Sequence, residues 1–192
     1  MGLIDYTAMF GDTIPEISAS LVEYATAGNG LFLRARRDVC KVAIPLAEAR
    51  IPGLAHVEPG MELFVPKVPL ACLERTYEAS RRACVARGAP VEYLCYLAWT
   101  GDGWEYLEPE QDASAASVRP VRTGLGDHAR ATIEIHSHHE MRARFSATDD
   151  EDEATGFRIY GVVGRIFSAP EIALRVGCHG HFLPIEAEEL FA

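Results

Sequence analysis

The spacing of hydrophobic residues predicts strands at the start of the chain. The segments 31–36 (LFLRAR) and 39–44 (VCKVAI) have the composition of paired strands, with Arg37 and Asp38 at the turn between them. The segment 61–68 (MELFVPKV) follows a Glu-Pro-Gly turn and predicts another strand. The first sixty-odd residues therefore predict a small β-rich unit.

A long helix is expected next. From Pro69 the apolar residues recur at roughly helical spacing, and the pattern ends with Arg87 in the last turn and Gly88 just beyond it. Pro90 prevents the helix from continuing. The segment corresponds to about five turns.

Strands predominate in the second half of the chain. Residues 110–128 show no periodicity and predict a long loop, and residues 146–156 predict the start of a short acidic helix. This order predicts an α+β fold with a β-rich N-terminal unit (1–68) and a second domain (69–192). Two hairpins are expected in this half, one that pairs 91–99 with 104–109 and one that pairs 157–167 with 171–178. A single strand is expected over 131–138.

Composition limits the classes of function. The 192 residues are 48% hydrophobic and carry a net charge of −10, which suits a folded domain and disfavours direct binding to nucleic-acid phosphates. No segment approaches the roughly 18 apolar residues of a membrane span, and the N-terminus does not resemble a secretory signal. The five cysteines are scattered and form no C-x-x-C pair, so we expect buried free thiols in a cytoplasmic protein.

The candidate chemistry lies in HSHHEMRARFSATDD, residues 136–150. Alternate side chains of a strand point the same way, so His136 and His138 are expected on one face, about 7 Å apart along the backbone. Asp149 follows eleven residues later, close enough for the loop to turn back. Two imidazoles, a carboxylate and an open fourth position are what zinc uses in hydrolases.

Simpler interpretations exist for each half of this stretch. Histidines are common on exposed strands, and Ser146 followed by Asp149 is also the signature of a capped helix start. The two interpretations are compatible, because a helix start at Ser146 would position Asp149 as a ligand. The segment 178–181 (CHGH) also offers metal-type side chains, but no second ligand pair follows it, so a core cysteine beside strand-end histidines is favoured.

The spacing H-x-H-x7-S-x-x-D resembles the metal motif of the JAB/JAMM (MPN, Mov34/PAD-1) metallopeptidases. The resemblance implies a JAB/MPN-like domain, in which a mixed β-sheet is flanked by helices and a metal site lies at a strand end. It implies Zn²⁺ as cofactor and His136, His138 and Asp149 as its ligands. It also implies Ser146 as a hydrogen-bond donor to the developing oxyanion.

The same family places a glutamate after its long helix, often in a P-x-E-x-x-G pattern. Here PVEYLC (90–95) occupies that place, which implies Glu92 as the general base. The chain departs from the family pattern at Cys95 (often Gly), His139 (often Pro) and Glu134 (often Trp). Because Glu134 falls on the strand face of the two histidines, it is a rival base or a partner that orients a ligand.

A narrower resemblance covers most of the chain. The segments GNGLFLRARRDVC, IPGL, FVPKVPL, GFRIYGVVGRI and RVGCHGHF are similar to the protein A family of the bacterial PRTRC cassette. This resemblance implies two partners, a ThiF-type adenylating protein and a ubiquitin-like protein, and a bacterial cytoplasmic location.

The expected function is therefore a zinc-dependent isopeptidase or C-terminal processing peptidase acting on a ubiquitin-like protein. One alternative is a non-catalytic MPN-type scaffold or binding module, although such scaffolds lack ligands and this chain keeps them all. Another is a zinc hydrolase of small amides or sulfur-carrier tails. A flexible substrate tail could add a strand beside the histidine-bearing strand, under the 110–128 loop.

Overall fold

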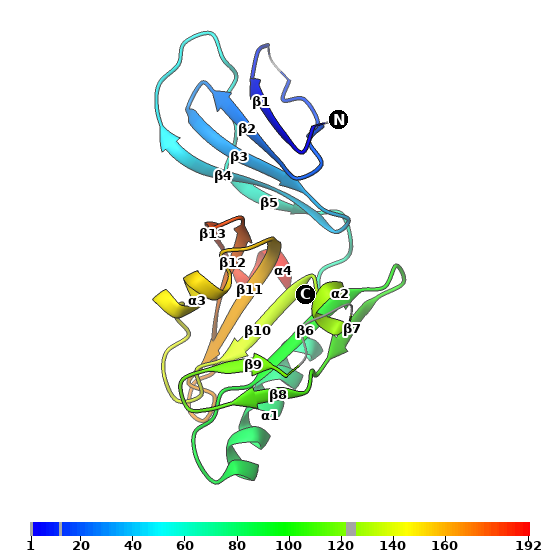
Figure 1. Cartoon of the computed structure of the whole chain (residues 1–192), viewed down its shortest axis with the longest axis vertical. Helices are drawn as coiled ribbons and strands as arrows, with labels where there is room; N and C mark the ends of the chain where they lie inside the picture. The colour runs from blue at the N-terminus through cyan, green and yellow to red at the C-terminus, as the bar shows by residue number, and fades with distance from the viewer. Residues whose placement is uncertain (1, 12, 122–125) are drawn as a thin grey trace.

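The computed structural model describes residues 2–11, 13–121 and 126–192, and two β-sheets follow one another along the long axis of the molecule (Figure 1). The N-terminal sheet has five strands in the order β1-β2-β3-β4-β5. β1 is parallel to β2, and the other neighbours are antiparallel. Its strands are β1 (Ile4–Ala8), β2 (Val22–Ala27), β3 (Gly30–Arg36), β4 (Cys40–Glu48) and β5 (Gly60–Leu63).

The second sheet has six strands in the order β13-β12-β11-β10-β6-β7. β10 and β11 are parallel and their other neighbours are antiparallel, so the sheet is mixed. A parallel pair needs a long crossover connection, and the segment between β10 and β11 supplies it with a helix, α3. The strands are β6 (Leu94–Trp99), β7 (Trp104–Leu107), β10 (Ile133–Ser137), β11 (Phe157–Gly164), β12 (Glu171–Cys178) and β13 (His181–Ile185).

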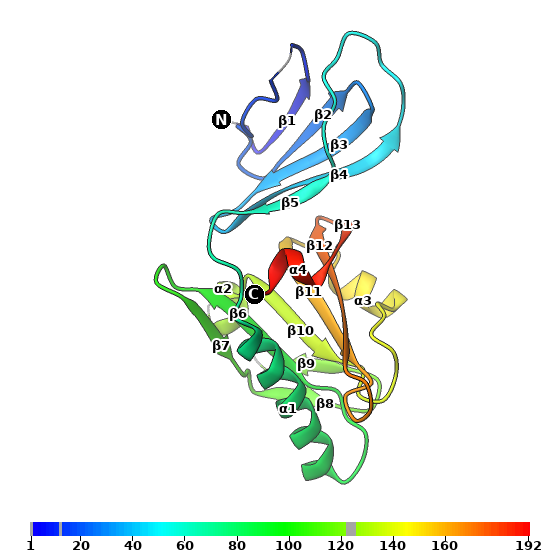
Figure 2. The same cartoon turned by 180° about the vertical axis from the view of Figure 1, so that it is seen from behind.

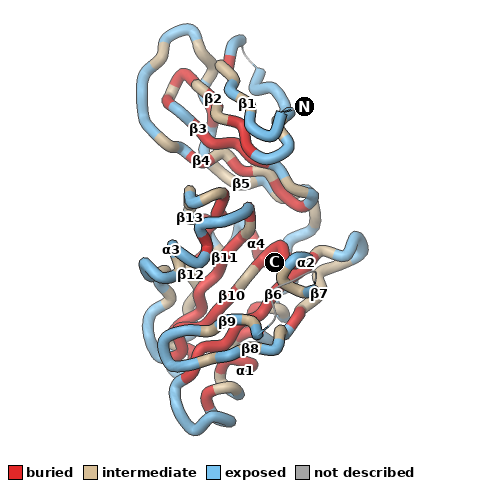
Figure 3. The backbone as a smooth tube through the Cα atoms, viewed as in Figure 1, coloured by how far each residue is buried: buried red, intermediate tan, exposed pale blue. Residues whose placement is uncertain are grey.

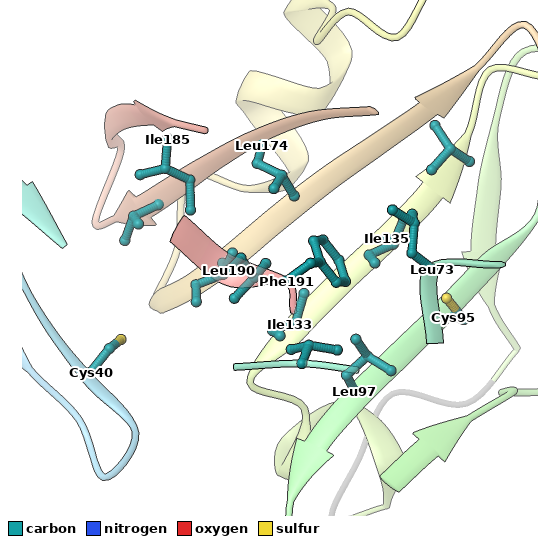
Figure 4. Close-up of a cluster of buried hydrophobic side chains, with 14 of the residues drawn as sticks. Cys40, Leu73, Cys95, Leu97, Ile133, Ile135, Leu174, Ile185, Leu190 and Phe191 are labelled. Atoms are coloured by element: carbon teal, nitrogen blue, oxygen red, sulfur yellow. The ribbon is translucent and has the colours of Figure 1, made fainter. Parts of the chain in front are cut away.

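The two faces of the second sheet are covered differently. α1 (Leu70–Arg87) lies across the face turned to the viewer in Figure 2, where Leu73 packs in one core with Ile133 and Ile135 of β10 (Figure 4). The opposite face carries the small elements seen in front in Figure 1. These are the hairpin β8 (Gln111–Ala113) and β9 (Val118–Pro120), α2 (Asp127–Arg130) and α3 (Ala147–Asp152), while α4 (Ala187–Leu190) ends the chain.

Most of the expected elements are present. The hairpins β3–β4, β6–β7 and β11–β12 are confirmed, as are the single strand β10 and the acidic helix α3. The long helix is also confirmed, and Gly88 ends it with a left-handed φ of 69°. The α+β class is therefore correct. None of the described helices is long and apolar enough to cross a lipid bilayer.

Other expectations were wrong. The segment 110–128 is not a structureless loop, because it contains β8, β9 and the start of α2; its residues 122–125 lie outside the described part of the chain. The strand expected over 61–68 ends at Leu63. Strands β1, β2 and β13 were not predicted. β1 has a partly exposed, irregular pattern and exists through its parallel pairing with β2, which no local pattern indicates.

The largest cluster of buried hydrophobic residues continues through both sheets, and each sheet has a smaller cluster on its other face. Buried residues such as Ile44 of β4 and Leu174 of β12 belong to one cluster, Cys40 lies at the edge of the group drawn in Figure 4, and the central strands of the second sheet are buried along most of their length (Figure 3). β13 contacts both β4 and β5. The proposed division into 1–68 and 69–192 follows the connection between the sheets, but it remains a prediction because the two sheets share this core.

Thiol accessibility tests this packing. Cys40, Cys84, Cys95 and Cys178 are buried and Cys72 is half-buried, and all five are free. Burial raises the pKa of Cys40 and of Cys178 to about 12, so little thiolate forms at neutral pH. With Ellman's reagent at pH 8 we expect Cys72 alone to react readily in the native protein, and all five thiols to react in denaturant. Rapid reaction of two or more thiols in the native protein would contradict the packing.

Candidate metal centre

The two histidines occupy the end of the central strand β10. His136 lies opposite Leu94 of β6 and Val162 of β11, and it is buried. His138 lies just beyond the strand, and its N–H donates to the Val163 carbonyl oxygen at 2.8 Å, which continues the ladder. Alternation places both imidazoles on one face, as expected from the sequence, and this face is opposite to the one on which Ile133 and Ile135 pack with Leu73 of α1. Their ring centroids are 4.9 Å apart.

Asp149 reaches the histidines through the first turn of α3. Ser146 is the N-cap residue, and the Asp149 N–H donates to its Oγ at 3.2 Å. In return, the Ser146 N–H and hydroxyl donate to Asp149 Oδ2 at 2.6 and 2.7 Å. This capping box fixes the carboxylate, and caps of this kind stabilise a helix by about 1 kcal/mol. The expected capped helix and the expected position of Asp149 therefore occur together.

Arg175 holds α3 against the sheet. Its guanidinium, buried on β12, lies 2.6 Å from Glu153 Oε2 and 2.5 Å from Asp150 Oδ1. It also stacks between the rings of Phe145 and Phe182, at 3.9 and 3.8 Å from their centroids. This cluster was not predicted, although an arginine within the apolar run IALRVGC was a signal for a buried ion pair.

The three predicted ligands converge. Their candidate ligand atoms all lie within 4.8 Å of one another. His136 Nε2 is 3.1 Å from His138 Nε2 and 3.2 Å from Asp149 Oδ1, and His138 Nε2 is 3.8 Å from Asp149 Oδ2. Ligands about 2.0–2.1 Å from a tetrahedral zinc lie about 3.3 Å from one another. The donor types and their spacing therefore fit Zn²⁺ with one open position.

Burial and mutual hydrogen bonds shift the pKa values of these three side chains. Burial opposes the charged form of His136, but the hydrogen bond and charge of Asp149 outweigh it and raise the pKa of His136. Burial would raise the pKa of Asp149, yet hydrogen bonds from His136 and Ser146 hold it well below its usual range. Burial and the charge of His136 lower the pKa of His138. One imidazole is thus already neutral, as a metal ligand must be.

Glu92 lies in the same cavity as the histidines. It precedes β6, it is buried, and its N–H donates to the Ser114 carbonyl oxygen at 2.8 Å. Burial raises the pKa of its carboxyl, although His136 acts against that shift. Among the described residues no hydrogen bond or ion pair to its carboxylate is present, which leaves it available to a water molecule or substrate. A carboxylate in such a place suits a general base.

Glu134 also lines this cavity but is engaged elsewhere. Its Oε2 accepts a hydrogen bond from Arg158 Nη1 at 2.5 Å, and both side chains are largely buried. An ion pair stabilises the charged carboxylate, so acting as a base would require Glu134 to give up this partner. Glu92 is therefore the better candidate of the two.

The turn of the β8–β9 hairpin forms part of the cavity wall through residues 116–118. His139, with an uncommon φ of 37°, directs its Nε2 to the Ala115 carbonyl oxygen at 2.9 Å. Arg119 of β9 lies 3.4 Å from Asp152 of α3, on the opposite side of the opening. The cavity has a free volume of about 90 Å³, enough for a few water molecules at about 30 Å³ each. A covering loop was expected from the sequence, but these contacts were not.

The second histidine-containing segment, 178–181, forms the end of β12 and the turn into β13. His179 and Gly180 have positive φ values of 49° and 81°, as a tight turn requires. Within the part of the chain that is described, the group formed by His136, His138 and Asp149 is the one set of three or more metal-type side chains close enough to share an ion.

Comparison with known proteins identifies one relationship. A model of the prokaryotic homologs of the JAB domain matches residues 74–177, which is more than half of the chain. The match begins in α1, ends in β12 and includes every candidate ligand as well as Glu92 and Ser146. No curated protein matches the chain significantly.

Zinc content tests the ligand set. We expect about one zinc per chain in the wild type by elemental mass spectrometry, and loss of that zinc in His136→Ala and Asp149→Asn, because each removes one of three ligands. Glu92→Gln should keep the metal, because Glu92 is not a ligand. His181→Ala is the matched control and should also keep it. A wild type that binds no zinc when supplied with it would rule out the site.

The loop between the ligands is held against β11 at Gly164. A Cβ at this position would lie 2.3 Å from the Ala143 nitrogen and 2.4 Å from the Met141 oxygen, too close without backbone movement. The Arg165 N–H donates to the same Met141 oxygen at 2.7 Å, and the Ala143 N–H donates to Glu171 Oε1 at 2.8 Å. The loop that leads to Asp149 is thus fixed to β11 and β12.

A Gly164→Ala variant tests this attachment. We expect the free energy of unfolding to fall by about 1–3 kcal/mol, and zinc affinity to fall at least tenfold, as is typical when the support of a ligand is disturbed. Gly103→Ala is the control, because Gly103 has open space around it. Chemical denaturation and competition with a zinc chelator measure the two effects. Unchanged zinc affinity in a destabilised Gly164→Ala protein would show that the attachment of this loop to β11 does not support zinc binding.

Proposed function

Because the chain belongs to the prokaryotic homologs of the JAB domain, we propose that it is a zinc-dependent peptidase that cleaves an isopeptide bond or the C-terminal tail of a ubiquitin-like protein. The family includes metallopeptidases. The observation that carries the proposal is the convergence of three zinc-type ligands within 4.8 Å in one cavity with the buried Glu92, whose carboxylate has no partner among the described residues.

The chemistry follows from the donor set. A zinc ion held by His136, His138 and Asp149 would supply Lewis acidity and make water a stronger nucleophile near neutral pH. Glu92 accepts a proton from the attacking water and then passes it to the leaving amine. Its raised pKa suits both steps, because the group must gain and lose the same proton during one turnover.

Ser146 has two roles in this proposal. It caps α3 and donates its hydroxyl hydrogen to Asp149 Oδ2 at 2.7 Å. To stabilise the negative charge that develops on the substrate carbonyl oxygen, the hydroxyl must rotate away from Asp149, while its oxygen still accepts the Asp149 N–H. A hydroxyl can make this exchange because its proton rotates freely about the C–O bond. Removal of a comparable oxyanion donor typically costs 10²–10³ in rate.

The covering hairpin limits which substrates fit. A free volume of about 90 Å³ does not admit a folded protein, so the substrate must present an extended segment and displace the turn between β8 and β9. A flexible tail of a ubiquitin-like protein has this form and could pair with an exposed strand as it enters. The small cavity also favours a second candidate function, the hydrolysis of small amides or of a sulfur-carrier tail.

The biological setting is part of the proposal and rests on the sequence resemblance to the PRTRC cassette. The substrate would be the ubiquitin-like protein of that cassette, a ThiF-type adenylating protein would be the second partner, and the compartment would be the bacterial cytoplasm. A non-catalytic MPN-type scaffold is disfavoured, because such a scaffold would not need to keep Glu92 unpaired beside a complete ligand set.

Activity of base variants tests the proposal. With zinc-loaded protein and a ubiquitin-like protein extended by a C-terminal peptide, we expect Glu92→Gln to reduce kcat by about 10²–10⁴ while keeping its zinc, because the proton acceptor is lost. Glu134→Gln is the control carboxylate in the same cavity and should change kcat less than tenfold. Cleavage is measured by mass spectrometry of the products.

Two outcomes would contradict this assignment. If Glu134→Gln is inactive and Glu92→Gln is active, Glu134 is the base. If the wild type holds zinc but cleaves neither protein tails nor small amides, the chain is a metal-binding scaffold.

A further inference from the structure

A second cavity adjoins the metal centre on the same face of the sheet. It has a free volume of about 250 Å³ and shares two lining residues, Glu134 and Asp152, with the metal cavity. Its far end is formed by Arg37, which belongs to the N-terminal unit, beside Phe157 at the start of β11. The two cavities therefore adjoin at Glu134 and Asp152, and the second one brings a residue of the N-terminal unit to the same face of the sheet as the candidate ligands.

Most charges in this second cavity are already neutralised. Arg158 is paired with Glu134, and its Nη2 donates to the His128 carbonyl oxygen at 2.7 Å. Burial and the charge of Arg158 lower the pKa of His128, so this imidazole is neutral at pH 7. Asp152 faces Arg119 at 3.4 Å. These groups together contribute no net charge.

Arg37 is the exception. It lies in the turn between β3 and β4, at the end of the N-terminal sheet that approaches the second sheet in Figures 1 and 2, and it is half-buried. Its Nη1 donates to the Phe157 carbonyl oxygen, which fixes the guanidinium at the cavity. Among the described residues no carboxylate lies within ion-pair distance of it, whereas its neighbour Arg36 is paired with Glu16.

The bond to the Phe157 carbonyl does not by itself explain an arginine. A neutral amide donor would satisfy that oxygen equally well and would avoid placing a full charge in a partly desolvated cavity. An arginine held at one nitrogen retains further N–H groups in a planar fork, which matches the geometry of a carboxylate. The unused donors and the uncompensated charge both indicate an anionic ligand with planar oxygens.

We propose that Arg37 is a specificity-determining residue that binds a carboxylate of the substrate in this second cavity, several residues away from the scissile bond, because Phe157 lies five positions along β11 from Val162, the partner of His136. The inference rests on the proposed peptidase function and adds the substrate feature that is recognised. The carboxylate could be the free C-terminus of a short tail or the side chain of an acidic residue in that tail. Either source makes the N-terminal unit part of the substrate site.

Four short peptides distinguish a C-terminal carboxylate from a side-chain carboxylate. Each is built from Gly and Ala with one Glu or one Gln, and each of these two sequences is made with a free C-terminal acid and with a C-terminal amide. Binding to the zinc-loaded wild type, Arg37→Gln and Arg37→Lys is measured by isothermal titration calorimetry, which does not depend on cleavage. Arg37→Gln keeps a donor for the Phe157 carbonyl and removes the charge, and Arg36→Gln is the control for loss of a neighbouring charge.

We expect Arg37→Gln to weaken binding of the carboxylate-bearing peptides at least tenfold, as for loss of one hydrogen bond to a charged group, and to leave the peptide without a carboxylate unchanged. Arg37→Lys should recover part of the affinity. If Arg37→Gln weakens the binding of the free-acid peptides only, Arg37 binds the C-terminal carboxylate. If it weakens the binding of the Glu peptides only, Arg37 binds the side-chain carboxylate. If Arg37→Gln weakens the binding of all four peptides equally, or if the wild type binds none of them, Arg37 does not bind a substrate carboxylate. If the wild type binds these peptides but cleaves neither protein tails nor small amides, the proposed function is refuted and the Arg37 site still stands.

Discussion

The ion pairs of Arg175 with α3 are the interaction on which the rest of the site depends. Asp149 is carried by a helix of only six residues, which would not be stable alone in water. Arg175 fixes that helix to β12 through Glu153 and Asp150, between two aromatic rings. Loss of one partner of a buried pair typically costs about 3–5 kcal/mol, so this cluster determines whether the third ligand stays beside the histidines.

The electrostatics of the centre follow from that arrangement. Asp149 and Glu92 are two of the carboxylates that line one cavity with the two imidazoles. The two carboxylates differ in the groups that surround them. Asp149 has hydrogen bonds from His136 and Ser146 that keep it charged, whereas burial raises the pKa of Glu92 against the opposing charge of His136. Two groups of the same chemical type are thereby prepared for different tasks, one as a ligand and one as a proton carrier.

The two sheets are connected by more than a linker. Their shared core and the contacts of β13 with β4 and β5 hold the N-terminal unit against the second sheet. Arg37 uses this fixed relationship, because its bond to the Phe157 carbonyl is useful only if the first sheet does not move relative to β11. The N-terminal unit thus contributes a charge to the face that carries the candidate chemistry, while α1 closes the other face.

The sequence by itself determined the parts of the site that are local. Strand alternation places His136 and His138 on one face, and the three-residue spacing of Ser146 and Asp149 produces the capping box, because both patterns depend on neighbouring residues alone. Tertiary structure decided the rest. Pairing of β10 with β6 and β11 brings Glu92 into the cavity, and pairing of β8 with β9 turns an apparent loop into a cover. Arg175 and Arg37 reach their partners across more than twenty and more than a hundred residues of chain, respectively, and no local pattern encodes contacts made at such separations.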